Sequence, residues 1–136
     1  SINPVTPAII EQAHQTAARY SSEESEFEAT GLTPLWHTGF DAPLVEQAGV
    51  KLGLQLREHQ ELKINGTHLV IGEVVLALIP AGCMLEDGAL DLESARSVAL
   101  SGLDSYYTPV ANKRMAYAKP HTPPRSLVSA NSDSFV

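Results

Sequence analysis

A switch to a two-residue hydrophobic period limits most strongly what this chain can fold into. From residue 50, apolar side chains alternate with polar or small ones over eight positions, the pattern of a half-buried β-strand. The apolar positions are Val50, Leu52, Leu54 and Leu56. A second run, from Thr67 to Ile79, is apolar at nearly every position from Val70 onward, which predicts a strand covered on both faces.

The two runs are joined by Asn65-Gly66, a pair that tolerates the positive φ values of a type I′ turn. We therefore expect an antiparallel hairpin that turns at 65–66. A two-residue turn there would place Lys63 opposite His68 and His59 opposite Gly72.

Helix signals lie on both sides of this hairpin. Thr6 and Pro7 suit the first positions of a helix, and an apolar stripe continues through Ile9, Ala13, Ala17 and Tyr20, which predicts a helix over 7–20. Asp91 as a cap and Gly102 as a stop predict a second helix over 91–101. Between these helices we expect a loop region around Trp36 and His37, and a turn at 86–88.

Residues 2–5 have the character of the end of a β-strand. A strand needs partners, and the expectation is that these lie upstream of residue 1. The chain is therefore expected to be the C-terminal portion of a larger domain.

Composition excludes several classes of function. Nine Lys or Arg against sixteen Asp or Glu give a net charge of −7, and without a basic stripe we expect no nucleic-acid partner. The single cysteine, Cys83, rules out an internal disulfide framework. Apolar runs stay well below the roughly 18 residues of a membrane span, so a cytoplasmic protein with no membrane partner is expected.

Motifs for acid–base, nucleophilic or metal chemistry do not emerge. The five histidines, at 14, 37, 59, 68 and 121, lack the spacing of metal ligands, and no G-x-S-x-G, G-x-G-x-x-G or P-loop pattern occurs. We accordingly predict no catalytic residue and no metal site in this chain.

One constellation remains, the H-x-x-x-G pattern formed by His68 and Gly72 at the start of the second strand. Two interpretations are open. The pair can be a hairpin end with an exposed histidine and a glycine bulge, or one face of a ligand site, because a strand glycine often marks close approach of a ligand or backbone.

Three segments resemble the flavin reductase-like, FMN-binding split-barrel proteins, including flavoredoxin-like members. They are Ser25-Glu26-Phe27-Glu28-Ala29-Thr30-Gly31-Leu32-Thr33-Pro34, His68-Leu69-Val70-Ile71-Gly72-Glu73-Val74 and Gly102-Leu103-Asp104-Ser105-Tyr106-Tyr107. The resemblance implies a mainly antiparallel split β-barrel with flanking helices and with its N-terminal strands missing. Residues 1–120 would form the C-terminal part of this single domain, and residues 121–136 a polar tail.

The same resemblance implies an FMN-dependent oxidoreductase in which hydride passes from NAD(P)H to the flavin. The electrons would go on to free flavin, ferric iron or a partner oxygenase, and the protein would be a homodimer. His68, Gly72, Tyr106 and Tyr107 would lie on the cofactor side. Because most flavin contacts would come from upstream strands, the chain alone should bind flavin weakly and be inactive. A non-enzymatic FMN-binding electron carrier and a cofactor-free scaffold are the alternatives.

Overall fold

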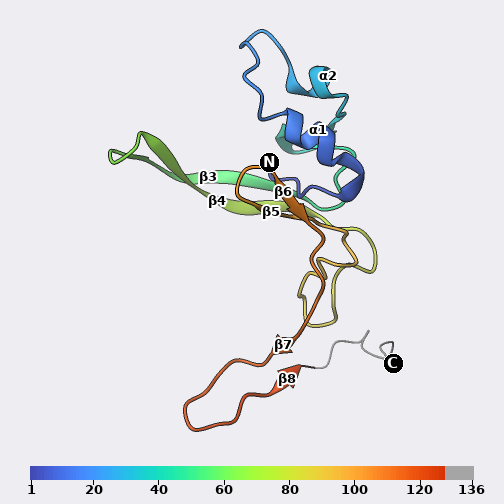
Figure 1. Cartoon of the computed structure of the whole chain (residues 1–136), viewed down its shortest axis with the longest axis vertical. Helices are drawn as coiled ribbons and strands as arrows, with labels where there is room; N and C mark the ends of the chain where they lie inside the picture. The colour runs from blue at the N-terminus through green and yellow to red at the C-terminus, as the bar shows by residue number, and fades with distance from the viewer. Residues whose placement is uncertain (128–136) are drawn as a thin grey trace.

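The computed structural model describes residues 1–127, which form a mainly β chain with a few short helices (Figure 1). The helical elements are η1 (Pro7–Ile9), α1 (Ile10–Gln15) and α2 (Glu26–Thr30). The strands are β1 (Pro34–His37), β2 (Phe40–Val45), β3 (Lys51–Leu62), β4 (Thr67–Leu78), β5 (Ala99–Ser101), β6 (Ser105–Tyr107), β7 (Arg114–Met115) and β8 (Ser126–Leu127). Among these residues the strands pair as four antiparallel two-stranded sheets, each made of consecutive strands.

The long β3–β4 hairpin is the central element, and it confirms the predicted pairing of the two apolar runs. Its register shifts twice, between Gly53 and Leu54 and between Leu56 and Glu58. The last pair before the turn is Leu62 with Thr67, so the connection has four residues, 63–66. Only Gly66 of the two expected turn residues has positive φ, so the predicted type I′ turn is wrong.

The longer connection also changes the cross-strand neighbours. His68 lies opposite Glu61, and Gly72 lies opposite Leu56, rather than opposite Lys63 and His59 as predicted. The carbonyl of Leu62 accepts the N–H of Gly66 at 2.9 Å, which closes the four-residue turn.

The first residues join the base of the hairpin. Ile2 and Leu52 exchange two backbone hydrogen bonds of 2.8 Å, and Val5 accepts the N–H of Val98 at 2.9 Å. Asn3 Oδ1 accepts the N–H of Val45 at 3.0 Å. The predicted strand character of residues 2–5 is thus limited to one β-bridge at Ile2, and its partner Leu52 lies downstream in β3 rather than upstream as expected.

The core lies at this base. Val50 is 1% exposed and packs with the buried Cys83 and Ala95, and three partly buried side chains surround them: Leu52, Ile79 and Leu90. On the other side of β3, Gly53 lies against the Phe40 ring, and a Cβ built on Gly53 would be 2.8 Å from it. The hydrophobic positions of the period-two pattern thus pack only at the start of the strand.

The predicted helix over 7–20 is wrong in length, because the α-helix ends at Gln15. Thr16 Oγ1 donates to the carbonyl of Ala13 at 2.7 Å, and Ala17 and Ala18 form tighter i→i−3 bonds. Such side-chain bonds compete with helical backbone bonds. Thr6 caps η1 with its carbonyl and makes no side-chain cap.

The predicted helix over 91–101 is also wrong, whereas the capping role of Asp91 is confirmed. Asp91 Oδ1 accepts the N–H groups of Glu93 and Ser94, but the turn stops at Arg96, whose φ is +52°. Residues 99–101 continue as β5, and Gly102, with φ of +63°, serves the turn into β6.

The segment at 86–88 is a turn, whereas the segment around Trp36 is part of a strand. The predicted turn at 86–88 is confirmed, with the N–H of Gly88 donating to the carbonyl of Leu85 at 2.9 Å. Trp36 and His37, expected in a loop, lie in β1, because the turn at Gly39 pairs β1 with β2.

The distal half of the hairpin is bare, which contradicts the prediction that β4 is covered on both faces. Five large apolar side chains of β4 are exposed: Leu69, Val70, Ile71, Val74 and Val75. In Figure 1 the tip of this hairpin projects to the left, clear of the other strands. No other element of the described chain packs there.

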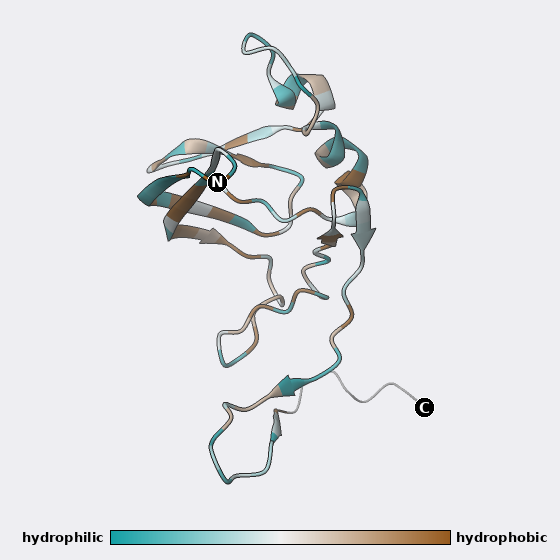
Figure 2. Ribbon diagram, turned by 60° about the vertical axis from the view of Figure 1, so that its left-hand side comes forward, coloured by the Kyte–Doolittle hydropathy of each residue, from teal (hydrophilic) through white to brown (hydrophobic). Residues whose placement is uncertain are grey.

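The last described residues form a projecting arm. β7 and β8 pair with each other at the end of the molecule opposite α2, and both ribbon views show the two ends far apart (Figures 1 and 2). Within the described residues, no helix is both long and apolar enough to cross a membrane. The predicted tail over 121–136 lies partly outside residues 1–127.

Candidate functional site

The candidate site is built around His68, near the start of β4. Its Nδ1 lies 2.9 Å from Nε2 of His59 on β3, and the two rings tilt by 35° with centroids 4.9 Å apart. Antiparallel pairing makes them diagonal neighbours, because His59 lies opposite Val70. The sequence indicated His68 as a site residue. The structure places His59 beside it, so that two exposed imidazoles lie on one face.

Aliphatic side chains flank the imidazole pair. Val70 follows His68 on the same face of β4, and Leu56 lies opposite Gly72 on β3. Val70 is 61% exposed and Leu56 is 62% exposed. The face therefore has two kinds of group side by side. The imidazole nitrogens can donate or accept hydrogen bonds, and the exposed aliphatic side chains offer an apolar surface.

Gly72 is small for a reason that strand packing explains. A Cβ built on it would lie 3.0 Å from both Cβ and Cδ2 of Leu54. The same glycine lies next to the register shift between Leu56 and Glu58. The side chain of Leu54 thus makes the close approach that the sequence left open, and the cofactor-binding role of Gly72 stays a prediction.

The ion pair of Arg57 and Glu73 joins β3 to β4, and alternation along β4 places Glu73 on the face opposite Gly72. Nε of Arg57 donates to Oε2 of Glu73 at 2.6 Å, and a terminal guanidinium nitrogen bonds to the same oxygen. The guanidinium is therefore already partnered within the hairpin.

The predicted tyrosines lie on β6, at a second place in the molecule. The hydroxyl of Tyr106 is 3.1 Å from Nδ1 of His14 on α1, and the two rings meet edge to face. Tyr107, paired with Ala99 of β5, is exposed. His68 thus contacts the other strand of its own hairpin, whereas Tyr106 joins β6 to α1.

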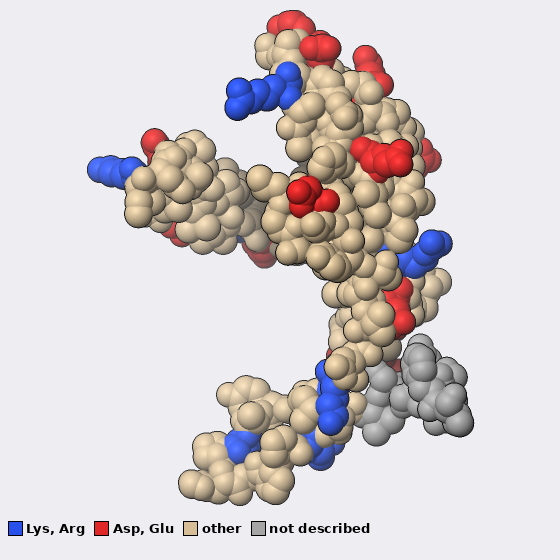
Figure 3. All heavy atoms as spheres, viewed as in Figure 1, with Lys and Arg blue, Asp and Glu red and all other residues tan. Residues whose placement is uncertain are grey.

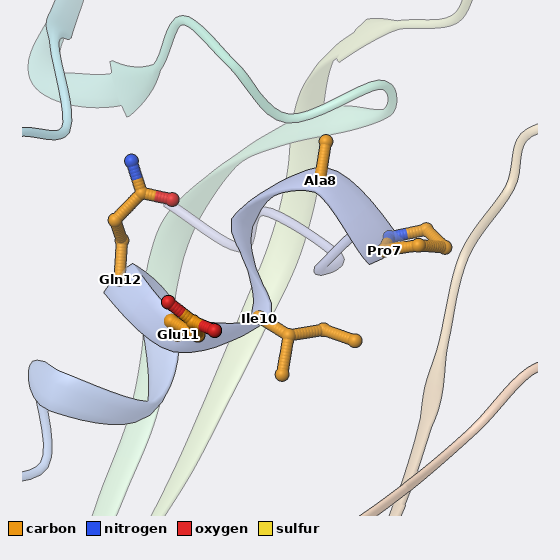
Figure 4. A pocket seen from close by; sticks show the side chains of 5 residues that line it. All are labelled: Pro7, Ala8, Ile10, Glu11 and Gln12. Carbon is orange, nitrogen blue, oxygen red and sulfur yellow. The ribbon is translucent and has the colours of Figure 1, made fainter.

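A shallow depression beside the first helix contains none of the predicted site residues. It is lined by Pro7, Ala8, Ile10, Glu11 and Gln12. All five come from one short helical segment, and Figure 4 shows that their side chains do not converge on a common point. The depression offers one carboxylate and no partner for it, so it does not form a chemical site.

In the described part of the chain, three carboxyl groups have displaced pKa values, and all lie away from the imidazole pair. Hydrogen bonds from Ser94 lower the pKa of Asp91, and a hydrogen bond from Arg114 lowers the pKa of Asp87. The backbone N–H of Ser21 lowers the pKa of Glu24. The hydrogen bonds that cause these shifts stabilise turns and the contact between Asp87 and Arg114. They mark no acid–base centre. Among residues 1–127, no group of three or more His, Cys, Asp or Glu side chains could hold a metal ion.

Sequence reasoning missed His59 and His14. His59 could have been found from the pairing of Leu62 with Thr67, because counting three residues back along β3 places it diagonal to His68. His14 had no comparable signal, since its contact with Tyr106 joins residues 92 positions apart.

No protein-family model matches the chain, and a search of curated proteins gives no match. Solved structures do match. A flavin reductase with a split-barrel domain from Shewanella frigidimarina NCIMB 400 is 50% identical, with a TM-score of 0.82 over 85% of this chain and 59% of that one. Flavoredoxin of Desulfovibrio vulgaris (Miyazaki F) is 27% identical, with a TM-score of 0.64 over 89% of this chain and 62% of that one.

Nitrilotriacetate monooxygenase component B from Bacillus cereus is 24% identical and shares the fold, with a TM-score of 0.67 over 81% of this chain and 56% of that one. The chain thus spans about three fifths of the length of these proteins. The antiparallel pairing of the strands agrees with the expected fold class. The resemblance predicted from the sequence is confirmed: over most of its length the chain has the fold of the split-barrel, flavin reductase-like proteins.

Proposed function

We propose that the intact protein is an FMN-dependent oxidoreductase of the flavin reductase type, in which NAD(P)H delivers hydride to the flavin. The observation that carries this proposal is the 50% identity to a split-barrel flavin reductase over 85% of the chain. The absence of an acid–base centre among the described residues agrees with it, because a flavin supplies the redox chemistry and the protein supplies binding and orientation.

The face around His68 has a donor set that fits a flavin ring better than a phosphate. Its imidazoles can bond to the polar edge of the ring, and exposed Val70 and Leu56 can pack against its flat surface. A phosphate would need free cationic groups, and the nearby Arg57 is paired with Glu73. In the proposed complex His68 orients the nicotinamide side of the flavin, and His59 holds the ring of His68 in place.

The tyrosines of β6 have a different part in the proposal. Tyr106 is held by His14, and exposed Tyr107 offers an aromatic face for stacking near the cofactor. In the proposed complex Gly72 would keep this part of β4 free of a side chain beside Leu54.

The wider setting is also proposed. The bare apolar residues of β4 form a surface that a monomer rarely leaves open, which supports a homodimer. A cytoplasmic location and transfer of electrons to free flavin, ferric iron or a partner oxygenase follow from the resemblance alone.

The test is steady-state oxidation of NADH and of NADPH by the intact protein with added FMN. His68→Ala should lower kcat/KM at least tenfold, a loss of about 1.4 kcal/mol of transition-state stabilisation. His37→Ala, at an exposed histidine of β1, is the matched control and should leave kcat/KM unchanged. Equal kinetics for both variants, with an unchanged circular dichroism spectrum, would refute the role of His68.

An electron-transfer module is the second candidate, favoured by the 27% identity to flavoredoxin. It predicts a bound flavin, visible by absorbance, without steady-state NAD(P)H oxidation. A colourless intact protein that does not take up FMN would instead identify a cofactor-free scaffold.

A further inference from the structure

Charge is distributed very unevenly between the two ends of this molecule. Residues 108–127, which we call the basic arm, contain four Lys or Arg and no Asp or Glu. Residues 1–107 contain five Lys or Arg and fifteen Asp or Glu, a net charge of −10. Figure 3 shows blue atoms on the arm at one end, whereas the red atoms lie over the rest of the molecule, including the opposite end.

Contacts at the base of the arm anchor it to the rest of the chain. There the carboxylate of Asp87 pairs with Arg114 at 2.7 Å, and Glu93 Oε2 accepts the N–H of Ala111 at 3.1 Å. Beyond Arg114 the arm bonds to itself, with the N–H of Ala116 donating to the carbonyl of Arg125 at 2.8 Å. One short strand pair, β7 with β8, lies at its neck and separates its distal part from the core.

The distal part of the arm exposes side chains that normally find a partner. Tyr117 is 91% exposed, and Met115 is exposed as well. Lys119 and Arg125 lie in the same segment and are exposed. An aromatic side chain among cations is typical of an interface that binds an acidic surface.

The chain itself presents such a surface. Residues 21–30, which we call the α2 segment, contain four glutamates and no cation, and all four glutamates are exposed: Glu23, Glu24, Glu26 and Glu28. The arm and the α2 segment lie at opposite ends of the molecule, so they cannot meet within one chain (Figures 1 and 3).

We propose that the basic arm of one copy docks on the α2 segment of a second copy, and the reverse, in a two-fold dimer. Two antiparallel copies bring each arm to the opposite α2 segment, so that both contacts form at once and the assembly closes. The inference rests on the proposed homodimer and adds a charged contact to the apolar face of β4. A polyanion such as nucleic acid is the less favoured partner, because the net charge of −10 on the rest of the chain repels it.

The test uses sedimentation velocity on the intact protein with two charge-reversed variants. One carries Lys119→Glu and Arg125→Glu in the arm, and the other carries Glu23→Lys and Glu28→Lys in the α2 segment. Each variant alone should dimerise at least tenfold more weakly than the wild type, because like charges then face each other. An equimolar mixture should dimerise with the wild-type affinity, since both contacts are complementary again. Added salt should weaken the wild-type dimer.

Lys63→Glu is the control, because it reverses an exposed charge at the hairpin turn and should leave dimerisation unchanged. Circular dichroism checks the fold of every variant. A monomeric wild type, unchanged dimerisation in both variants, or a mixture no better than its components would overturn the proposal. So would binding of the arm to a DNA oligonucleotide that is lost in the arm variant while self-association stays intact.

Flavin absorbance of the same variants separates this inference from the proposed function. If the variants bind flavin while dimerisation ignores the arm, the docking proposal fails and the flavoprotein assignment stands. If dimerisation follows the charge pattern in a protein that takes up no flavin, the docking proposal stands and the flavoprotein assignment fails.

Discussion

At its base the β3–β4 hairpin is packed between the first residues, the Phe40 ring and the turn around Cys83, and toward its tip it is bare on both faces. Both halves have antiparallel backbone pairing, although the base half contains more apolar side chains. Backbone pairing alone therefore does not decide where the stability lies. The base holds the fold together, and the distal half presents the imidazole pair and apolar side chains to a ligand or a partner.

The largest expected effect compares two valines of the hairpin. Val50→Ala should lower the free energy of unfolding by about 2 kcal/mol, because it leaves a cavity beside Cys83 and Ala95. Val70→Ala, at an exposed position, should change it by less than about 0.5 kcal/mol. Urea denaturation of the intact protein measures both. Equal losses would show that the distal half is as well packed as the base.

Glycines sharpen the same comparison at a smaller magnitude. Gly53→Ala brings a methyl group to 2.8 Å from the Phe40 ring, and we expect a loss of about 1–2 kcal/mol from overpacking. Gly72→Ala meets Leu54 at 3.0 Å rather than 2.8 Å, in a more exposed part of the hairpin, so its loss should be smaller. Thermal unfolding of the two variants decides the order, and a larger loss at Gly72 would reverse our view of the hairpin.

Asp91 tests the turn that packs against the base. Asp91→Ala removes the acceptor for two N–H groups and should cost about 1 kcal/mol. Hydrogen bonds from Ser94 lower the pKa of Asp91, so its contribution is complete above the ordinary carboxyl range and is lost as the pH falls through the lowered value. The stability gap between wild type and Asp91→Ala should therefore narrow in acid. A gap that does not depend on pH would show that the carboxylate charge is not involved.

The smallest effect belongs to the distal half. Arg57→Gln breaks the ion pair with Glu73, whose side chains are both about half exposed, and should cost less than about 1 kcal/mol. The loss should shrink further in high salt, because exposed pairs are screened. Chemical denaturation at low and high salt provides the measurement, and a large loss that ignores salt would place this pair in a covered environment.

Local patterns predicted the hairpin, the limits of its second strand to within one residue and the turn at 86–88, because these depend on neighbouring residues. The failures have a common physical cause. The helix predicted over 91–101 gave way to a turn because Val98 bonds to Val5, a tertiary contact that no local pattern contains. Likewise, the run after Val70 indicated a strand correctly, but the sequence did not specify what packs against it.

The candidate site shows the same division. His68 and Gly72 were recognisable because they share a strand at a spacing of four, and the structure confirms that they lie on one face. Their neighbours His59 and Leu54 depend on a turn of four residues rather than two, so a small error in turn length misplaced them. Tyr106 could be named, but its partner His14 could not.

The buried Cys83 makes this base observable in solution. It is the single thiol of the chain and is 4% exposed, packed against Val50 and Ala95. A buried thiol reacts with a disulfide reagent only when its surroundings open. The rate of thiol labelling under native conditions therefore measures how often the base of the hairpin opens, without any engineered probe.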